Sequence, residues 1–127
     1  MNIPEIKILE LKFPEYDMMD INIVELGYDE DNNLRVVTFN IPNTPVPTMD
    51  EIRGWGEDEY IQKQYKVMLN HIYNQPIIAQ LNELDLVAIR PLMENDTQRI
   101  AQLNAEKSIL RAQLLPTDTD LIILGDL

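Results

Sequence analysis

The stretch that decides the fold is LDLVAIRPLMENDTQRIAQLNAEKSILRAQLL, residues 84–115. In its second half, apolar residues recur at steps of three and four, and a single lysine fills one step of the series. Because successive residues of an α-helix turn by about 100°, this spacing puts the side chains on one side of a helix. These seam residues are Ile100, Leu103, Lys107, Leu110 and Leu114. The polar run 94–97 separates them from an apolar first half, which predicts a helical hairpin or short coiled coil.

The seam residues are candidate partner-binding residues. Helices of this length are weakly stable alone in water, so the aliphatic ridge from Ile77 to Leu114 needs the sheet, a second copy or another protein to cover it. A homo-oligomer is therefore expected. Two interpretations of Lys107 stay open: it fixes the register of the partner helices, or it extends from the edge of the seam to water.

The N-terminal third predicts a small antiparallel β-sheet of three strands. Residues 6–13 alternate imperfectly between apolar and charged side chains, which is typical of a strand. Two further β-rich runs, 20–28 and 34–41, are joined by the turn formers of 29–33 and predict a β-hairpin.

Residues 42–47 contain three prolines and predict a stiff, extended connector. Thr48 followed by Glu51 is the pattern of a capping box at a helix start. Two glycines on either side of Trp55 should end that helix.

A second helix should begin at the acidic residues 57–59, where the helix dipole favours negative charge, and end near Tyr73. Another begins near Pro76, and Pro91 predicts a kink or a fresh helix start. The last helix should be capped at 96–97.

The last helix should stop before Pro116, and the tail then carries a short aliphatic run. This run is a candidate for strand addition to a partner and comprises Leu121, Ile122, Ile123 and Leu124. The chain is therefore predicted to be an α+β protein with a β-rich region and connector (1–47), a helical region (48–115) and a tail (116–127).

Composition excludes several classes of function. The 127 residues carry 22 acidic and 10 basic side chains, a net charge of −12, and 14 of the acids lie in residues 1–60. Such a chain repels phosphate, so neither nucleic acid nor an anionic membrane is expected as a partner. With no cysteine and one histidine, no metal site, cofactor or catalytic triad is expected. No signal peptide or membrane-spanning run is evident, which favours a cytoplasmic origin.

Three local patterns have a structural and a functional interpretation. Asp29, Asp31 and Asn33 have the opening spacing of a calcium loop, but the later ligands are missing, which favours a plain hairpin turn. Trp55 is either an exposed interface anchor or, as we favour, a core residue against Phe39. The acids at 57–59 suggest helix-dipole complementarity rather than a pair of catalytic carboxylates, and no enzyme is expected.

Two segments resemble small proteins encoded beside tail-fibre genes in tailed bacteriophages, of the tail-fibre-assembly or XkdW-like kind. The first runs from an aromatic strand through the proline-rich link to a helix start, and the second is a Leu-Asp-x-x-x-Ile-Arg-Pro-Leu segment with a closing Leu-Arg-Ala-Gln-Leu helix. The residues that carry the resemblance are Phe39, Asn40, Ile41, Pro42–Pro47, Thr48, Glu51, Ile52, Trp55, Leu84, Asp85, Ile89–Leu92 and Leu110–Leu114.

The resemblance touches about half of the chain and implies a non-enzymatic viral protein that binds the tail fibre or baseplate. It would act either as an assembly chaperone in the host cytoplasm or as a virion component in the tail. The first fifteen residues and the aliphatic tail have no counterpart in it. The acidity of the chain keeps an alternative open: a host-directed inhibitor that mimics nucleic acid.

Overall fold

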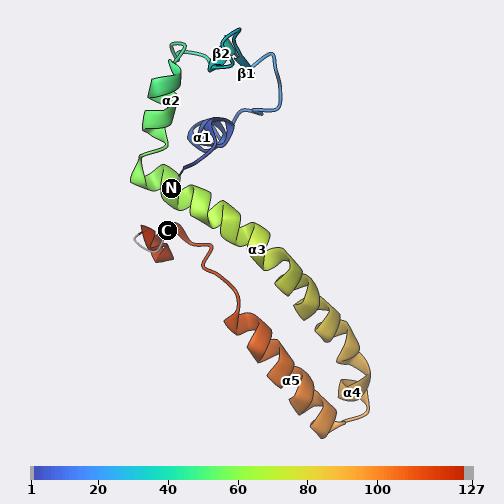
Figure 1. Cartoon of the computed structure of the whole chain (residues 1–127). Coiled ribbons are helices and arrows are strands. Elements are labelled where there is room, and N and C mark those ends of the chain that lie inside the picture. Colours follow the sequence, from blue (N-terminus) through green and yellow to red (C-terminus); the bar gives the residue numbers. More distant parts are fainter. Residues whose placement is uncertain (1, 125–127) are drawn as a thin grey trace. The chain divides into compact units, whose positions relative to one another are not determined.

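The computed structural model describes residues 2–124 and has an α+β fold (Figure 1). Its elements, in chain order, are α1 (Glu5–Lys12), β1 (Val24–Tyr28), β2 (Leu34–Phe39), α2 (Met49–Trp55), α3 (Glu59–Val87), α4 (Ile89–Met93), α5 (Thr97–Ala112) and the 3-10 turn η1 (Thr119–Leu121). The chain divides into two compact units. Among the described residues, the first comprises 2–66 with 123–124, and the second comprises Val67–Ile122.

The predicted β-hairpin is confirmed. Strands β1 and β2 pair antiparallel, from Val24 opposite Phe39 to Tyr28 opposite Leu34, with a bulge in β2 at Val37. In the loop, Asp29 Oδ1 accepts hydrogen bonds of 2.9 Å from two backbone N–H groups two and four residues on. The carboxylate is therefore used by the turn, which supports the structural interpretation of this loop over a calcium site.

The third strand was predicted wrongly, because the segment expected to form it is the helix α1. Pro4 precedes the helix, and its carbonyl oxygen accepts the N–H groups of Lys7 and Ile8. Ile8 and Leu9 are both fully buried. Neighbouring residues of a strand point to opposite faces of the sheet, so a strand would leave one of these two side chains in water. A helix packs both into one core.

The core of the first unit gathers side chains from α1, the hairpin, α2 and the start of α3. Its buried residues are Ile3, Ile8, Leu9, Met18, Val24, Phe39, Ile41, Ile52 and Ile61. Phe13 lies at the edge of this core, with ring centroids 6.0 Å from Phe39 and 5.8 Å from Trp55, both edge-to-face. Trp55 is half-buried against the core. The Lys12 ammonium lies over its ring, 4.8 Å from the ring centroid.

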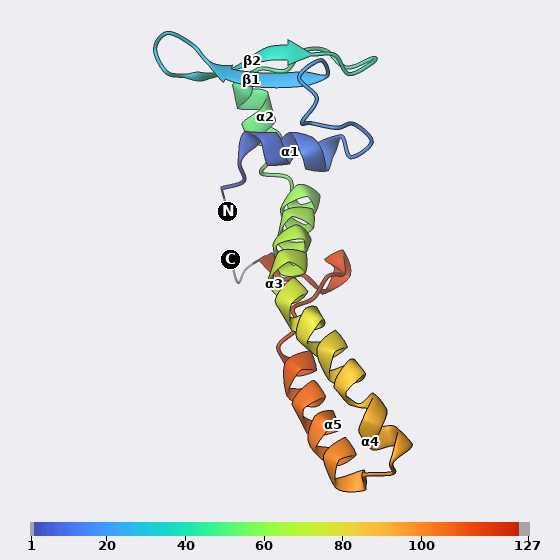
Figure 2. The same cartoon turned by 90° about the vertical axis from the view of Figure 1, so that its right-hand side faces the viewer.

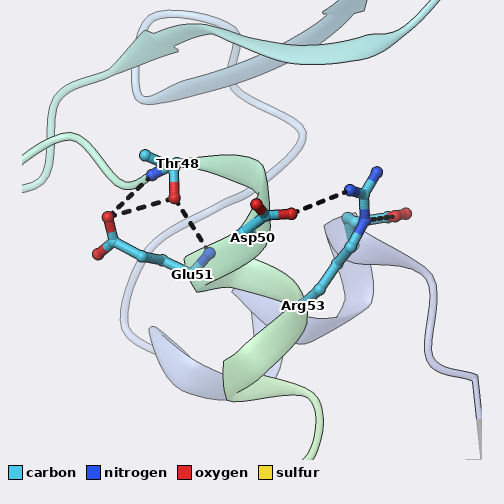
Figure 3. Close-up of polar contacts among 5 residues, drawn as sticks. Thr48, Asp50, Glu51 and Arg53 are labelled. Atoms are coloured by element: carbon cyan, nitrogen blue, oxygen red, sulfur yellow. Dashed lines mark hydrogen bonds and ion pairs between the residues drawn. The ribbon is translucent and has the colours of Figure 1, made fainter.

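Helix α2 begins with the capping box that the sequence predicts (Figure 3). The Thr48 hydroxyl accepts the Glu51 N–H at 3.1 Å, and Glu51 Oε1 accepts the Thr48 N–H at 3.4 Å. Arg53 pairs with Asp50 on the same helix and with Glu5 of α1, which ties the two helices together. The helix ends at Trp55, with Gly56 as its cap.

Helix α3 is longer than predicted, because it does not end near Tyr73 but continues through Pro76 to Val87. Proline removes one backbone donor from a helix and costs about 3 kcal/mol. Asn74 and Ile77, on either side of Pro76, are both buried, and their packing offsets this cost and keeps the helix continuous. At its start, Asp58 Oδ1 accepts the N–H of Tyr60, so one of the predicted dipole-favoured acids is a cap.

The second half of the chain follows the predicted boundaries closely. Pro91 lies in the first turn of α4, a fresh helix start. Asp96 caps α5 by accepting the Arg99 N–H at 3.1 Å, and α5 ends before Pro116. Helices α3 and α5 lie side by side and run in opposite directions, with α4 at the turn between them (Figures 1 and 2).

The tail forms no strand within the described residues. Leu121 belongs to the 3-10 turn η1, and the sheet consists of β1 and β2. Leu121 and Ile123 are exposed, Ile122 is buried and Leu124 is half-buried. Strand addition to a partner stays a prediction.

Candidate functional site

Four of the seam residues form the inner face of α5, and Leu114 lies two residues beyond the end of that helix. Leu103 is 1% exposed, and the other four are half-buried, whereas most of the remaining positions on this helix face water. Ile109, the other large apolar residue of the helix, is 63% exposed. The predicted face of the helix therefore turns inward within the chain, and Leu103 is covered without a second copy.

Helix α3 supplies a matching row, of which the sequence predicted the aliphatic part from Ile77 onward but not the two residues before it. Its least exposed positions between residues 70 and 88 follow steps of four and three, the spacing of a two-helix seam. These positions are Asn70, Asn74, Ile77, Leu81 and Leu84 on α3, followed by Ala88 just beyond its end. The expected hairpin thus has a first arm formed by the long α3 rather than by the short segment after Leu84. Stepping back from Ile77 by three and then four residues would have found the two asparagines.

The two asparagines hold the segment that follows α5. Asn74 binds Leu115 twice: its Nδ2 donates to the carbonyl oxygen at 3.0 Å, and its Oδ1 accepts the N–H at 2.9 Å. Asn70 Nδ2 donates to the Pro116 carbonyl at 2.7 Å. Both residues are at least 96% buried, so these three hydrogen bonds pair polar groups where little water reaches them.

Lys107 forms the one charged contact of the described seam. Its ammonium lies 2.6 Å from Asp85 Oδ1 on α3. Hydrogen bonding and the positive charge of Lys107 hold the pKa of the Asp85 carboxyl below its ordinary value. The aliphatic part of Lys107 is mostly buried, and its ammonium contacts an exposed carboxylate at the edge of the seam. The residue thus lies between the two interpretations given above, a lysine that fixes the register and one that extends from the seam edge to water. At the turn of the hairpin, Arg90 forms an ion pair with Glu94.

The turn of the hairpin presents apolar side chains to water. Each of these tip residues is at least half exposed: Leu86, Val87, Ile89, Leu92 and Met93. Five aliphatic side chains within eight residues are more than a solvated turn needs, and such clusters mark sites of protein contact.

The first unit has shallow concavities on its surface. One, of about 480 Å³, lies beside the pair formed by Glu5 and Arg53, and another, of about 660 Å³, lies beside Trp55 and Tyr60. No three His, Cys, Asp or Glu side chains in the described part of the chain come close enough together to hold a metal ion. None of the helices formed by residues 2–124 combines the length and apolar character needed to cross a bilayer.

The surface best suited to function is therefore the helical hairpin formed by α3, α4 and α5 within the second unit, and its apolar tip above all. No protein-family model, curated protein or solved structure matches the chain.

Proposed function

We propose that the protein is a non-enzymatic protein-binding module that contacts its partner with the tip of the helical hairpin. The observation that carries this proposal is the exposed aliphatic cluster around α4, which includes Leu92 and Met93. Burying such side chains against a partner yields about 25 cal/mol per Å² of apolar surface, which is the main source of association energy.

The partner that the sequence resemblance suggests is a tail fibre or baseplate protein of a bacteriophage. In this role the protein either guides assembly of the fibre in the host cytoplasm or remains in the tail as a virion component. Mass spectrometry of purified particles separates the two roles: a fixed copy number per particle supports the structural role, and absence supports the chaperone role.

Two methionines of equal exposure provide a matched test of the tip. Met93 at the tip is 79% exposed, and Met19 in the first unit is 80% exposed. Because both face water, Met93→Asp and Met19→Asp should fold like the parent chain. The assay is co-purification with a bacteriophage tail-fibre protein that is expressed together with the chain. Met93→Asp should lose the fibre protein while Met19→Asp retains it. Equal capture by both variants contradicts the proposed site.

A second candidate function rests on charge. The first unit carries 14 acidic and 6 basic residues between positions 1 and 66, a surplus typical of proteins that occupy nucleic-acid-binding sites on other proteins. A host-directed inhibitor of this kind would bind a nucleic-acid-binding protein with an affinity that falls steeply as the salt concentration rises. The Met93→Asp substitution at the tip would leave that binding unchanged.

A further inference from the structure

A groove runs along one side of the helical hairpin, between α3 and α5. Its volume is about 410 Å³, and its residues come from both helices: Gln80, Glu83, Leu84, Val87, Glu106, Ile109 and Leu110. Two of the aliphatic residues, Val87 and Ile109, are more than half exposed, although they face a concave surface. The groove shares Leu84 and Leu110 with the edge of the seam and adjoins the tip through Val87.

The shape of this groove fits an α-helix. Two neighbouring antiparallel helices leave a channel along their flank, and a third helix packs into such a channel at an axial distance of about 8–10 Å. On α3 the lining extends from Gln80 to Val87, which is about 10 Å or two helical turns. An amphipathic helix with apolar residues at positions i, i+3 or i+4, and i+7 would cover this length.

The charge of the groove selects among such helices. Glu83 and Glu106 line it from opposite helices, both are exposed, and neither takes part in an ion pair within the described residues. Asp85, which does not line the groove, is by contrast paired with Lys107. The groove therefore has an apolar floor and two uncompensated carboxylates.

A second copy of this chain is a poor occupant. Each copy carries a net charge of −12, and symmetric packing of the two grooves would bring four unpaired carboxylates together. A helix whose apolar ridge is flanked by lysine or arginine fits the groove better. Its ridge would pack on the apolar floor, and its basic residues would pair with Glu83 and Glu106.

We infer that the groove between α3 and α5 binds an amphipathic α-helix of a partner protein, with basic residues flanking its apolar ridge. This inference rests on the proposed function, in that the hairpin is the protein-binding part of the chain. It adds a second contact beside the tip and states the chemistry of the segment that fills it.

The test uses the full chain and two designed peptides of about 14 residues, or four helical turns. Both peptides have the same apolar ridge, which is flanked by lysine in one and by glutamate in the other. Binding is followed by chemical-shift changes of the labelled protein at low salt. The lysine peptide should perturb the amides of Val87 and Ile109 and bind about tenfold more tightly than the glutamate peptide. In the double variant Glu83→Lys/Glu106→Lys this preference should reverse.

A matched pair of isoleucines controls for the apolar floor. Ile109 lines the groove, and Ile78 of α3 does not, although it is 46% exposed. Ile109→Ser should weaken binding of the lysine peptide severalfold, and Ile78→Ser should leave it unchanged. Since both positions face water, both variants should keep the circular dichroism of the parent.

Three results overturn the inference: equal binding of both peptides, perturbation of a surface elsewhere, or a dimer of the free chain that Ile109→Ser dissociates. The last result assigns the groove to a second copy. Specific peptide binding without capture of the fibre protein overturns the proposed function alone. Capture that depends on Met93, without peptide binding in the groove, overturns this inference alone.

Discussion

Truncating Leu103 to alanine should destabilise the second unit by about 2–3 kcal/mol. The side chain is 1% exposed, and Leu→Ala substitutions at buried sites cost about 2–5 kcal/mol, of which part is the cavity left behind. The hairpin is only two helices thick and has solvent on its flanks, so its helices can close on the cavity. The lower end of the range therefore applies.

The control is Ile109→Ala on the same helix. Ile109 is 63% exposed, so its truncation should change the free energy of unfolding by less than about 0.5 kcal/mol. The measurement is urea unfolding followed by circular dichroism at 222 nm. With a denaturant dependence of about 1 kcal/mol per molar urea, the midpoint of Leu103→Ala should fall by about 2–3 M.

Equal midpoints for these two variants would refute the assignment of the inner face. Unfolding at two protein concentrations tests the same claim in another way. If the loss caused by Leu103→Ala depended on concentration, a second copy would be covering the leucine rather than α3.

Gly54→Ala should stabilise α2 by about 0.5–1 kcal/mol because its Cβ meets open space, whereas Gly56→Ala should destabilise the unit because its Cβ would lie 2.6 Å from a buried isoleucine. Thermal unfolding separates the two, and equal shifts would contradict this packing. Asn74→Ala should lower the free energy of unfolding by about 1–3 kcal/mol. The backbone N–H of Leu115, which donates to Asn74 Oδ1, should then exchange with deuterium at least about tenfold faster. Because Lys107 lowers the folded-state pKa of Asp85, the stability from this pair is present at neutral pH and is lost as the pH falls below the ordinary carboxyl pKa of about 4. Carbon NMR titration of the Asp85 carboxyl should show a higher midpoint in Lys107→Met, and an unchanged midpoint would show that the contact does not persist in solution.

The features that the sequence predicts correctly depend on residues within a few positions of one another. The capping box of Thr48 and Glu51, the cap at Asp96 and the turn at 29–33 each complete their hydrogen bonds locally. No knowledge of the tertiary structure was needed for them.

The errors concern segments whose conformation is decided by distant contacts. Residues 5–12 suit either a strand or a helix until the core that receives both Ile8 and Leu9 is known. Pro76 suggests a break until the buried neighbours that keep α3 continuous are known. Both cases are tertiary packing overriding a local preference.

The candidate site was half predictable for a related reason. The inner face of α5 consists mainly of apolar residues and stands out from the sequence. The facing row of α3 contains Asn70 and Asn74, which look like solvent-facing residues until their hydrogen bonds to residues 115 and 116 are seen. The groove combines two helix flanks that are about 20 residues apart in the chain, and no spacing rule connects them.

The two asparagines determine which of several alignments the hairpin adopts. A ladder of aliphatic residues repeating every seven positions would tolerate a slip of one repeat, about 10 Å along the helix axis, with similar burial after the slip. Only one alignment brings the backbone at Leu115 opposite Asn74. Any slipped form would leave the buried side-chain amides of Asn70 and Asn74 without these hydrogen-bond partners. The hairpin therefore has a single length, and its tip lies at a fixed distance from the two asparagines.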